Sequence, residues 1–357
     1  MSQFHRLTVA EVHPETEDTV SIVFDLPQGL QSKFHYQHGQ YLTLRTQING
    51  EEVRRAYSIC ESIGQQKLRI VVKQIPGGRF STWANSALTV GQSLDVMPPE
   101  GHFTSVLSPK HQGEYLLVAA GSGITPIMSI ITSILEIEVD TKVTLIYGNR
   151  TTSSMIFRED LQDLQCKYPE RFRMISVMSR EPQSNELLTG RIDSAKVNAV
   201  LKQWIEPRLI RACFICGPDT MAVDVRQALL ALGLEPQQIH SEQFTLPVIG
   251  DNQYHNCVDL PANTDFSTIT VHIDGHTHTF ELAQNNQSIL AAALETGADL
   301  PWSCNAGVCS TCTCKVIEGQ VHMQENHVLQ DDELRAGYVL SCQSYPLSAT
   351  VILDYDT

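Results

Sequence analysis

The sequence contains no long hydrophobic run, and we do not expect a secretory signal at its start. Its apolar stretches, such as Leu116–Ala120, are far shorter than the roughly 20 residues that a helix needs to cross a bilayer. The first residues, MSQFHR, lack the apolar segment of a secretory signal. The 357 residues, 42% hydrophobic and 18% charged, are typical of two or three folded domains. We therefore expect a globular protein of the cytoplasm.

Basic residues are scarce, with 25 Lys and Arg against 40 Asp and Glu and a net charge of −15. A nucleic-acid-binding protein needs a basic face, so this composition argues against that class. The imbalance is strongest in residues 266–357, which contain 11 acidic and 2 basic residues. Such an acidic segment attracts a basic partner or simply keeps the protein soluble, and the composition leaves both possibilities open.

Residues 1–110 have the pattern of β-strands. The segment Leu7–Phe24 is rich in Val, Ile and Thr, and the pair Asn49-Gly50 separates two further strand-like segments. Asn-Gly between alternating segments is a strong hairpin signal, and Gly and Pro punctuate the rest. This region is predicted to form an antiparallel β-barrel.

Residues 111–244 change to alternating strands and helices, which predicts an α/β domain with a parallel sheet. Its first strand, Tyr115–Ala120, leads into Gly121-Ser122-Gly123 and then a helical segment from Pro126. A loop of this kind offers backbone N–H groups to a pyrophosphate. It departs from the G-x-G-x-x-G pattern because Pro126 takes the third glycine position, where the first turn of a helix tolerates proline.

Residues 245–267 are rich in Pro, Gly and Asn and are predicted to be a linker, followed by a third domain over residues 268–357. That domain is expected to begin with a hairpin around Asp274-Gly275. A short helix over Ser288–Thr296 would follow and end at Gly297.

The third domain also contains five of the ten cysteines. Four of them have the C-x4-C-x2-C…C spacing of a plant-type [2Fe-2S] ligand set: Cys304, Cys309, Cys312 and Cys342. Thiolates bind zinc as well, but zinc sites use paired C-x2-C motifs or Cys with His, so this spacing fits zinc poorly. Cys314 is left over, and a buried apolar role is favoured over a further ligand.

The segments LPWSCNAGVCSTCTCKVIEG and GYVLSCQ resemble a plant-type ferredoxin domain over about 90 residues. The resemblance implies a β-grasp fold and assigns the four spaced cysteines to the cluster.

Two segments of the first domain, RRAYSIC from Arg54 and GGRFS from Gly77, each fit an ordinary strand or turn when taken alone. Together they resemble the ferredoxin–NADP reductase family. The resemblance implies that Arg55 holds the flavin pyrophosphate, that Tyr57 packs on the isoalloxazine and that Ser58 lies near its N5. It adds contacts to the pyrophosphate and adenosine from Val72, Lys73, Gly78 and Ser81. GGRFS favours FAD over FMN, which some such reductases use.

The segments GSGITP and CFICGPDTM resemble the pyridine-nucleotide site of the same family. The implied contacts are Gly121, Gly123, Thr125, Pro126, Cys216, Gly217 and Pro218, and the catalytic candidates are Ser58, Thr125 and Cys216. Cys213 and Cys216 lie three apart on one strand and so point to opposite faces, which argues against a dithiol pair. Phe244 is a candidate for packing on the flavin, with an ordinary core position as the alternative.

The choice of nucleotide depends on a few residues that follow the second and third strands of this domain. Arginine suits a 2′-phosphate, so Arg150 and Arg180 favour NADPH, and Asn149 beside Arg150 is a further candidate for nucleotide binding. Ordinary surface arginines would leave NADH possible.

These cofactors imply one order of electron transfer. A nicotinamide gives two electrons at once and an iron–sulfur cluster accepts one, so the flavin must stand between them. The expected route is NADPH to FAD to [2Fe-2S] and then to an external acceptor.

The nature of that acceptor comes from resemblance. RRAYSIC, GSGITPIMSII, LIYGNRTTSSMIFR and ELRAGYVLSCQ resemble the reductase components of bacterial phenylacetyl-CoA epoxidases. This implies a multisubunit di-iron oxygenase of phenylacetate breakdown that docks on the acidic ferredoxin domain. The alternatives are the reductase of another oxygenase or desaturase system, and a cluster-based redox sensor.

Overall fold

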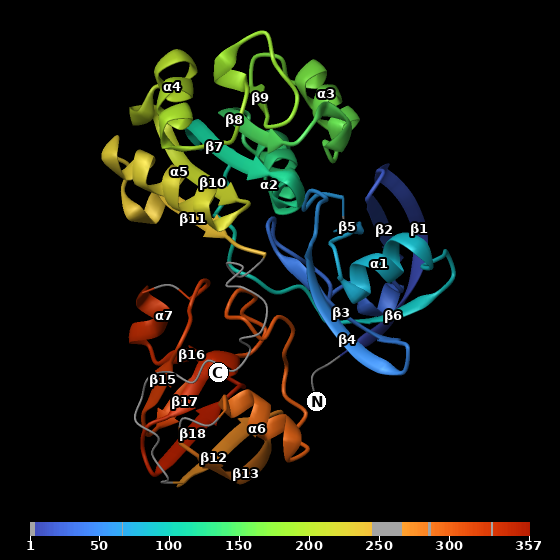
Figure 1. Cartoon of the computed structure of the whole chain (residues 1–357), viewed down its shortest axis with the longest axis vertical. Coiled ribbons are helices and arrows are strands. Elements are labelled where there is room, and N and C mark those ends of the chain that lie inside the picture. The colour runs from blue at the N-terminus through green and yellow to red at the C-terminus, as the bar shows by residue number, and fades with distance from the viewer. Residues whose placement is uncertain (1–3, 66, 245–265, 285–286, 330) are drawn as a thin grey trace. The chain divides into compact units, whose positions relative to one another are not determined.

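The computed structural model describes residues 4–65, 67–244, 266–284, 287–329 and 331–357 (Figure 1). The chain forms two compact units, the larger built from residues 5–53 and 57–244 and the smaller mainly from residues 266–357. Among the helices of the described residues, none has the length and hydropathy of a membrane span.

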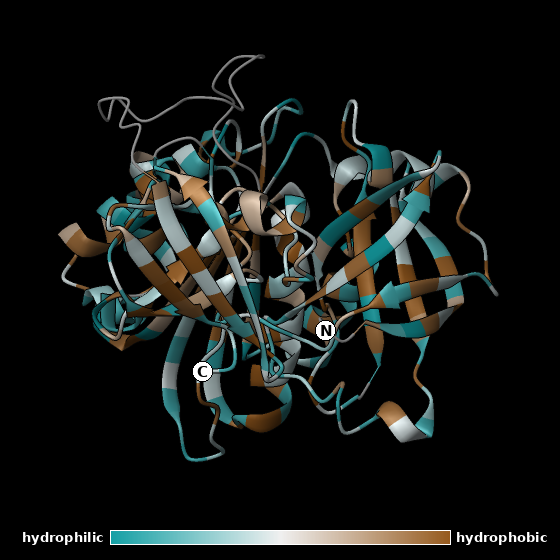
Figure 2. Ribbon diagram, turned by 90° about the horizontal axis from the view of Figure 1, so that it is seen from below, coloured by the Kyte–Doolittle hydropathy of each residue, from teal (hydrophilic) through white to brown (hydrophobic). Residues whose placement is uncertain are grey.

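The first part of the larger unit is a six-stranded antiparallel sheet with the order β4-β3-β6-β1-β2-β5. A bridge between Ile59 and Ile70 joins the end of β4 to β5 and closes the sheet into a barrel. Hydrophobic and hydrophilic residues alternate along its strands, as a filled barrel requires (Figure 2). The strands are β1 (His5–Thr16), β2 (Thr19–Asp25), β3 (Tyr41–Ile48), β4 (Glu51–Ser58), β5 (Leu68–Lys73) and β6 (Ser93–Val96).

The turn between β3 and β4 confirms the predicted hairpin. Asn49 has a φ of 55° and Gly50 a φ of 81°, so both central residues are in the left-handed region that a type I′ hairpin turn requires. The barrel also carries a helix that was not predicted, α1 (Arg79–Ser86). Asn85 fixes this helix to the barrel by donating from Nδ2 to the carbonyl oxygen of Val72 over 3.1 Å.

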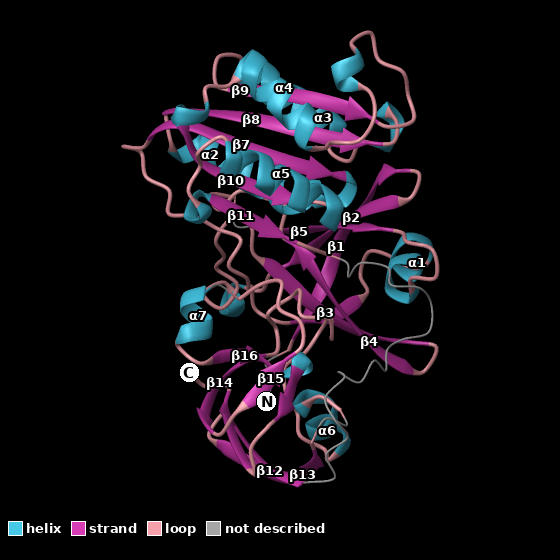
Figure 3. Ribbon diagram, turned by 60° about the vertical axis from the view of Figure 1, so that its left-hand side comes forward, coloured by secondary structure: helices cyan, strands magenta, loops and turns pink. Residues whose placement is uncertain are grey.

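The second part of the larger unit is a five-stranded parallel sheet with the order β11-β10-β7-β8-β9, as the sequence predicts. Helices lie on both sides of it (Figure 3). Residues of α2 and α3 share one hydrophobic core with the sheet, and residues of α4 and α5 share a second. The elements are β7 (Gln112–Ala120), α2 (Ile124–Ile137), β8 (Asp140–Asn149), α3 (Arg158–Lys167), β9 (Phe172–Met178), α4 (Ser194–Trp204), β10 (Ile210–Cys216), α5 (Asp219–Ala231) and β11 (Ile239–Glu242).

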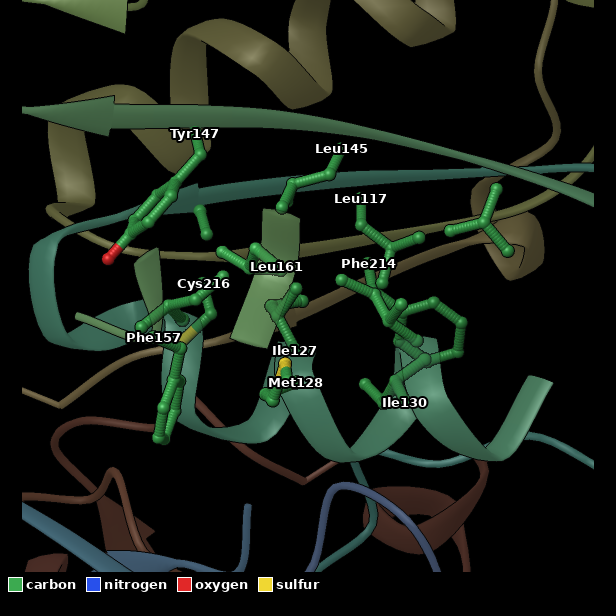
Figure 4. Packing of buried hydrophobic residues seen from close by; sticks show 14 of the residues in the cluster. Leu117, Ile127, Met128, Ile130, Leu145, Tyr147, Phe157, Leu161, Phe214 and Cys216 are labelled. Carbon is green, nitrogen blue, oxygen red and sulfur yellow. The ribbon is translucent and has the colours of Figure 1, made fainter. Parts of the chain in front are cut away.

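Helix α2 is the most hydrophobic helix of this domain among the described residues. Figure 4 shows Ile127 and Ile130 pointing from α2 toward Leu117, Leu145 and Phe214 of the strands, and all five side chains are fully buried. This packing fixes α2, and therefore the glycine loop before it, against the sheet.

Two helices of this domain differ from what the sequence predicts. The sequence pattern predicts a helix over Met155–Leu164, but the helix begins only at Arg158, because Phe157 has a φ of 59° and turns the chain sharply. Helix α4 was not predicted, since its Lys, Asn and Gln residues interrupt the hydrophobic pattern.

The smaller unit contains a five-stranded mixed sheet with the order β13-β12-β18-β14-β16 and a two-stranded ribbon of β15 and β17. The predicted hairpin is confirmed, with φ values of 51° at Asp274 and 72° at Gly275. Gly297, with a φ of 90°, follows α6 as expected. The elements are β12 (Phe266–Ile273), β13 (His276–Ala283), α6 (Ile289–Glu295), β14 (Thr313–Glu318), β15 (Val321–Met323), α7 (Asp331–Arg335), β16 (Tyr338–Leu340), β17 (Ser344–Pro346) and β18 (Thr350–Asp354).

The fold class expected from the sequence is therefore the observed one. Of the expected linker, residues 245–265 lie outside the described residues, and β12 begins directly after them at Phe266.

Candidate cofactor sites

The four spaced cysteines come from two segments of the smaller unit: three lie in the loop between α6 and β14, and Cys342 lies in the short turn after β16. Cys309, Cys312 and Cys342 are buried, whereas Cys304 is partly exposed. Hydrogen bonding with Cys309 and then Cys342 holds the pKa of Cys304 far below its ordinary value. Hydrogen bonding with Cys304 raises the pKa of both Cys309 and Cys342, and Cys342 also interacts with Cys312. The four sulfur atoms therefore form one connected group.

Backbone N–H groups of the same loop point at these sulfur atoms. Cys304 N donates to Cys309 Sγ over 3.4 Å and Ala306 N donates to Cys304 Sγ over 3.3 Å. Positive φ values at Asn305, Gly307 and Ser310, from 50° to 71°, turn the backbone so that this is possible. Hydrogen bonds to the sulfurs tune an iron–sulfur cluster, so the residues present fit this group.

Among the described residues no three His, Cys, Asp or Glu side chains are arranged around a single metal ion. A [2Fe-2S] group instead distributes its four thiolate ligands over two irons. Cys314 lies on β14 in the hydrophobic core of this unit, in keeping with a buried apolar role.

The expected flavin-binding residues lie at the end of β4 and around α1. Tyr57 packs against Phe80 of α1, with ring centroids 5.4 Å apart, and Ser58 is buried at the end of β4. Arg55 is exposed on the same strand and donates from Nη1 to the carbonyl oxygen of Arg54 over 2.6 Å. An exposed guanidinium suits a phosphate, and a half-buried aromatic ring suits packing on a planar ring system.

The GGRFS segment forms a loop that leads into the N-terminus of α1. Gly77 has a φ of 72°, and Gly78 is the residue before the first turn. A Cβ at Gly78 would collide with Ser81, whose Oγ accepts from Ile75 N over 3.2 Å. The free N–H groups of this helix start fit a pyrophosphate.

Val72 and Lys73 lie at the end of β5, the strand to which Asn85 ties α1. Val72 is fully buried, and Lys73 Nζ is 3.6 Å from Asp18 Oδ2. The structure thus brings both residues near the start of the flavin-binding loop, while their contacts with a cofactor stay a prediction.

The expected nucleotide loop lies at the switch point of the parallel sheet, where β7 and β10 are neighbours and the chain leaves them toward opposite sides. Ligands of open α/β sheets bind at such points. Gly121 has a φ of 55°, and a Cβ at Gly123 would collide with the carbonyl oxygen of Cys216. Thr125 donates from Oγ1 to Ser122 O over 3.0 Å, and Pro126 occupies the first turn of α2.

Loops after the neighbouring strands gather at the same edge of the sheet. Ser179 N donates to Asn149 O over 2.9 Å, and Arg180 N donates to Arg150 O over 2.8 Å. Both arginine side chains are exposed. Gly217 and Pro218 follow β10, and Gly217 lies against Ala120 at the end of β7. The structure brings together all the expected nucleotide contacts of these loops.

The two cysteines of β10 point to opposite faces, as expected. Cys216 belongs to the core shared with α2, and Cys213 belongs to the core shared with α4 and α5. Both are free thiols whose pKa burial raises.

One residue at this edge was missed. Glu242, at the end of β11, is the direct partner of Cys216 in the parallel pairing. Its Oε2 atom is buried without a hydrogen-bond partner among the described residues, and burial raises its pKa to about 8. The sequence gives no signal for it beyond an acidic residue in SEQF, because its place beside Cys216 depends on the pairing of β11 with β10. Phe244, two residues later, is 41% exposed, so the structure does not place it in a core.

Comparison with known proteins assigns each part of the chain to a domain family. Residues 6–105 match the oxidoreductase FAD-binding domain, residues 117–227 the oxidoreductase NAD-binding domain and residues 271–347 the 2Fe-2S iron–sulfur cluster binding domain. Over its full length the chain is 46% identical to a subunit of the 1,2-phenylacetyl-CoA epoxidase of Escherichia coli K12, covering 99% of that protein. The chain belongs to the ferredoxin–NADP reductase-type family of oxygenase reductases that carry FAD, NAD and 2Fe-2S domains.

Two further proteins are similar to the chain over nearly its whole length, one in sequence and one in fold. The ferredoxin reductase component of 3-ketosteroid-9-alpha-monooxygenase from Rhodococcus rhodochrous is 35% identical, with 98% of this chain and 96% of that protein covered. The solved structure of phthalate dioxygenase reductase has a TM-score of 0.61 at 22% identity and 98% coverage of both chains. This oxidoreductase family binds FAD, NAD(P)H and a [2Fe-2S] cluster. Electrons pass from NAD(P)H to FAD and then to the cluster.

Proposed function

We propose that the chain is the NADPH-dependent reductase of a di-iron oxygenase that acts on phenylacetyl-CoA. The observation that carries the proposal is the 46% identity to the 1,2-phenylacetyl-CoA epoxidase component across all three domains. The proposal includes a cytoplasmic setting, where the cysteine ligands stay reduced. The oxygenase is supplied by other chains.

In this proposal the chain's own residues hold the cofactors, and the cofactors supply hydride and single-electron chemistry. Arg55 and the start of α1 bind the FAD pyrophosphate, while Tyr57 and Ser58 face its ring. Thr125 and Cys216 orient the nicotinamide. The four cysteines of the smaller unit hold the cluster, and the backbone N–H groups of their loop stabilise it.

The preference for NADPH rests on Arg150 and Arg180. Their loops are joined by the hydrogen bond from Arg180 N to Arg150 O, so two exposed guanidinium groups start from neighbouring backbone positions. Two adjacent cations suit a 2′-phosphate better than a ribose hydroxyl.

The proposed docking face is the acidic surface of the ferredoxin domain. Residues 266–357 carry 11 acidic and 2 basic residues. Three acidic residues follow one another on α7, Asp331, Asp332 and Glu333, and the first two are exposed. Complementary charge steers a basic partner to such a face.

The test is reconstitution. The purified protein should show flavin and iron–sulfur absorption, bleach with NADPH, and co-purify with the oxygenase components of a phenylacetyl-CoA epoxidase. The mixture should oxygenate phenylacetyl-CoA in preference to a panel of other acyl-CoA thioesters. Reduction of the protein without oxygenation of any thioester would keep the reductase but reject this partner. The ketosteroid and glycine betaine systems of its relatives would then be the next acceptors to try.

A further inference from the structure

Two buried serines of α2 form hydrogen bonds with the flavin-binding barrel. Ser129 donates from Oγ to the carbonyl oxygen of Glu61 over 2.6 Å, and the backbone N–H of Ile63 donates to Ser133 Oγ over 3.2 Å. Both serine side chains are fully buried. The partners are 68 and 70 residues apart in sequence, so these bonds join the two parts of the larger unit directly.

The two serines lie on the same face of α2 as Thr125, the residue expected to contact the nicotinamide. Thr125, Ser129 and Ser133 are spaced four residues apart, which places them on one face of α2. At a rise of about 1.5 Å per residue, Ser129 follows Thr125 by roughly 6 Å along the helix axis. Figure 4 shows that other residues of α2, Ile127 and Ile130, face the sheet.

On the barrel side, the hydrogen-bonded residue Glu61 lies close in sequence to Ser58, the expected flavin-binding residue. Glu61 follows Ser58 by three residues, just past the end of β4. Glu61 Oε1 also accepts a hydrogen bond from Arg69 Nη1 over 3.4 Å, so both the side chain and the backbone of Glu61 are held in place. Ser58 and Thr125 are therefore linked by three short steps: the backbone from Ser58 to Glu61, the hydrogen bond from Glu61 to Ser129, and one turn of α2 from Ser129 to Thr125.

Simple packing does not account for serine at these two positions. A buried hydroxyl costs free energy unless it forms a hydrogen bond, and alanine would fill the same space without that cost. Serines in helices often donate back to their own helix, as the neighbouring Thr132 does to Met128 O over 2.8 Å. Ser129 donates to the barrel instead.

We propose that Ser129 and Ser133 are positioning residues that hold the nicotinamide-binding loop in register with the flavin-binding strand. Hydride transfer needs its donor and acceptor atoms at near-contact distance, and a misplacement of about 1 Å can reduce its rate about 100-fold. The serines touch neither cofactor and act through Thr125 and Ser58. The inference rests on the proposed roles of those two residues.

The test uses the holoprotein and the variants Ser129→Ala, Ser133→Ala and the double variant. Stopped-flow reduction of the flavin by NADPH should give a limiting rate about threefold lower in each single variant and about tenfold lower in the double variant, with the apparent Kd for NADPH unchanged. Thr132→Ala is the matched control on the same helix, because its hydroxyl bonds to Met128 O and Ser129 O. It should leave the limiting rate as in the parent protein.

A second measurement does not depend on turnover. Removal of the Ser133 acceptor should make the amide of Ile63 exchange with deuterium about tenfold faster, since one hydrogen bond is lost. Unchanged exchange in Ser133→Ala, or an unchanged limiting rate in the double variant, would overturn the proposal. If NADPH fails to reduce the flavin of the parent protein, the proposed function itself is wrong. If NADPH reduces the parent protein and the double variant equally fast, the proposed function stands and only the positioning role of the two serines is wrong.

Discussion

Arg180 donates its backbone N–H to the carbonyl oxygen of Arg150 over 2.8 Å, which joins the loops after β8 and β9 at the nucleotide edge of the sheet. Both side chains are exposed there. The backbone bond sets the spacing of the two loops independently of either side chain, so substitution of one arginine removes its charge without dismantling the loop.

The first prediction concerns the choice of nucleotide. Arg180→Ala should raise the KM for NADPH by about 10- to 100-fold, because a charge-assisted hydrogen bond to a phosphate contributes about 1.5–3 kcal/mol. The KM for NADH should change less than twofold. Steady-state reduction of a one-electron dye with each nucleotide measures both values. Arg208→Ala, an exposed arginine elsewhere in the domain, is the control and should affect neither. Equal losses with both nucleotides would contradict the 2′-phosphate assignment.

The second prediction concerns the cluster. Cys309→Ser should remove the [2Fe-2S] absorption and electron paramagnetic resonance signals, since a hydroxyl is a poor replacement for a buried thiolate ligand. Reduction of the flavin by NADPH should stay at the parent rate, while transfer to a cluster-dependent acceptor should be lost. Cys166→Ser changes an exposed cysteine and should keep both activities. Loss of flavin reduction in a folded Cys309→Ser protein would show that the order of carriers is wrong.

Local chemistry explains which parts of the fold the sequence could predict. The Asn49-Gly50 and Asp274-Gly275 turns were predictable because a type I′ hairpin turn requires positive φ at both central positions, which Asn-Gly and Asp-Gly adopt readily. The edge of the parallel sheet that carries the nucleotide loops follows from the alternation of strands and helices. These features depend on a few neighbouring residues each.

The missed features depend on contacts between distant residues. Helix α1 has the sequence RFSTWANS, whose Ser, Thr and Asn favour loops, and it is held by the barrel strand β5 through Asn85. The position of Glu242 beside Cys216 depends on the pairing of β11 with β10. The role of Ser129 depends on Glu61, which is 68 residues away. The hydrophobic pattern of a short sequence segment cannot predict these contacts, because each of them depends on a residue far away in the sequence.

The third prediction concerns the buried carboxyl at the nucleotide edge. Burial raises the pKa of Glu242 to about 8 in the folded protein, whereas the unfolded chain ionises at the ordinary, lower value. The protonated form therefore stabilises the fold at low pH, and this contribution is lost as the pH rises through about 8. Glu242→Gln stays neutral, so its unfolding free energy should fall less between pH 5 and about 9 than that of the parent protein.

Urea unfolding at a series of pH values measures this difference. Glu159→Gln, which changes an exposed carboxyl of α3, is the control and should leave the parent pH profile as it is. Parallel profiles for Glu242→Gln and the parent protein would show that Glu242 is ionised in the fold at neutral pH.

The last prediction concerns the ion-pair group at Arg69, where the barrel meets α3. Arg69 Nη2 is 2.6 Å from Glu15 and 3.8 Å from Asp160, and Nη1 is 3.4 Å from Glu61. Its guanidinium also lies 5.0 Å from the ring centroid of Phe157, the residue with a φ of 59°. The side chains of Glu15 and Glu61 are only 11% and 13% exposed, so removal of the arginine leaves two poorly solvated carboxylates.

Arg69→Met keeps most of the aliphatic stem and should cost about 3 kcal/mol, the order expected when one partner of a buried ion pair is removed. Arg45→Met is the matched control, because Arg45 of β3 pairs with Asp95 of the neighbouring strand β6, whose side chain is 38% exposed, and such pairs contribute about 1 kcal/mol or less. Differential scanning calorimetry should therefore show a drop in Tm that is several-fold larger for Arg69→Met. The loss should persist in about 0.5 M salt, since salt screens partly buried charges weakly. If the two variants lose the same stability, or the loss disappears in salt, the Arg69 group behaves as a surface ion pair and does not hold the barrel to α3.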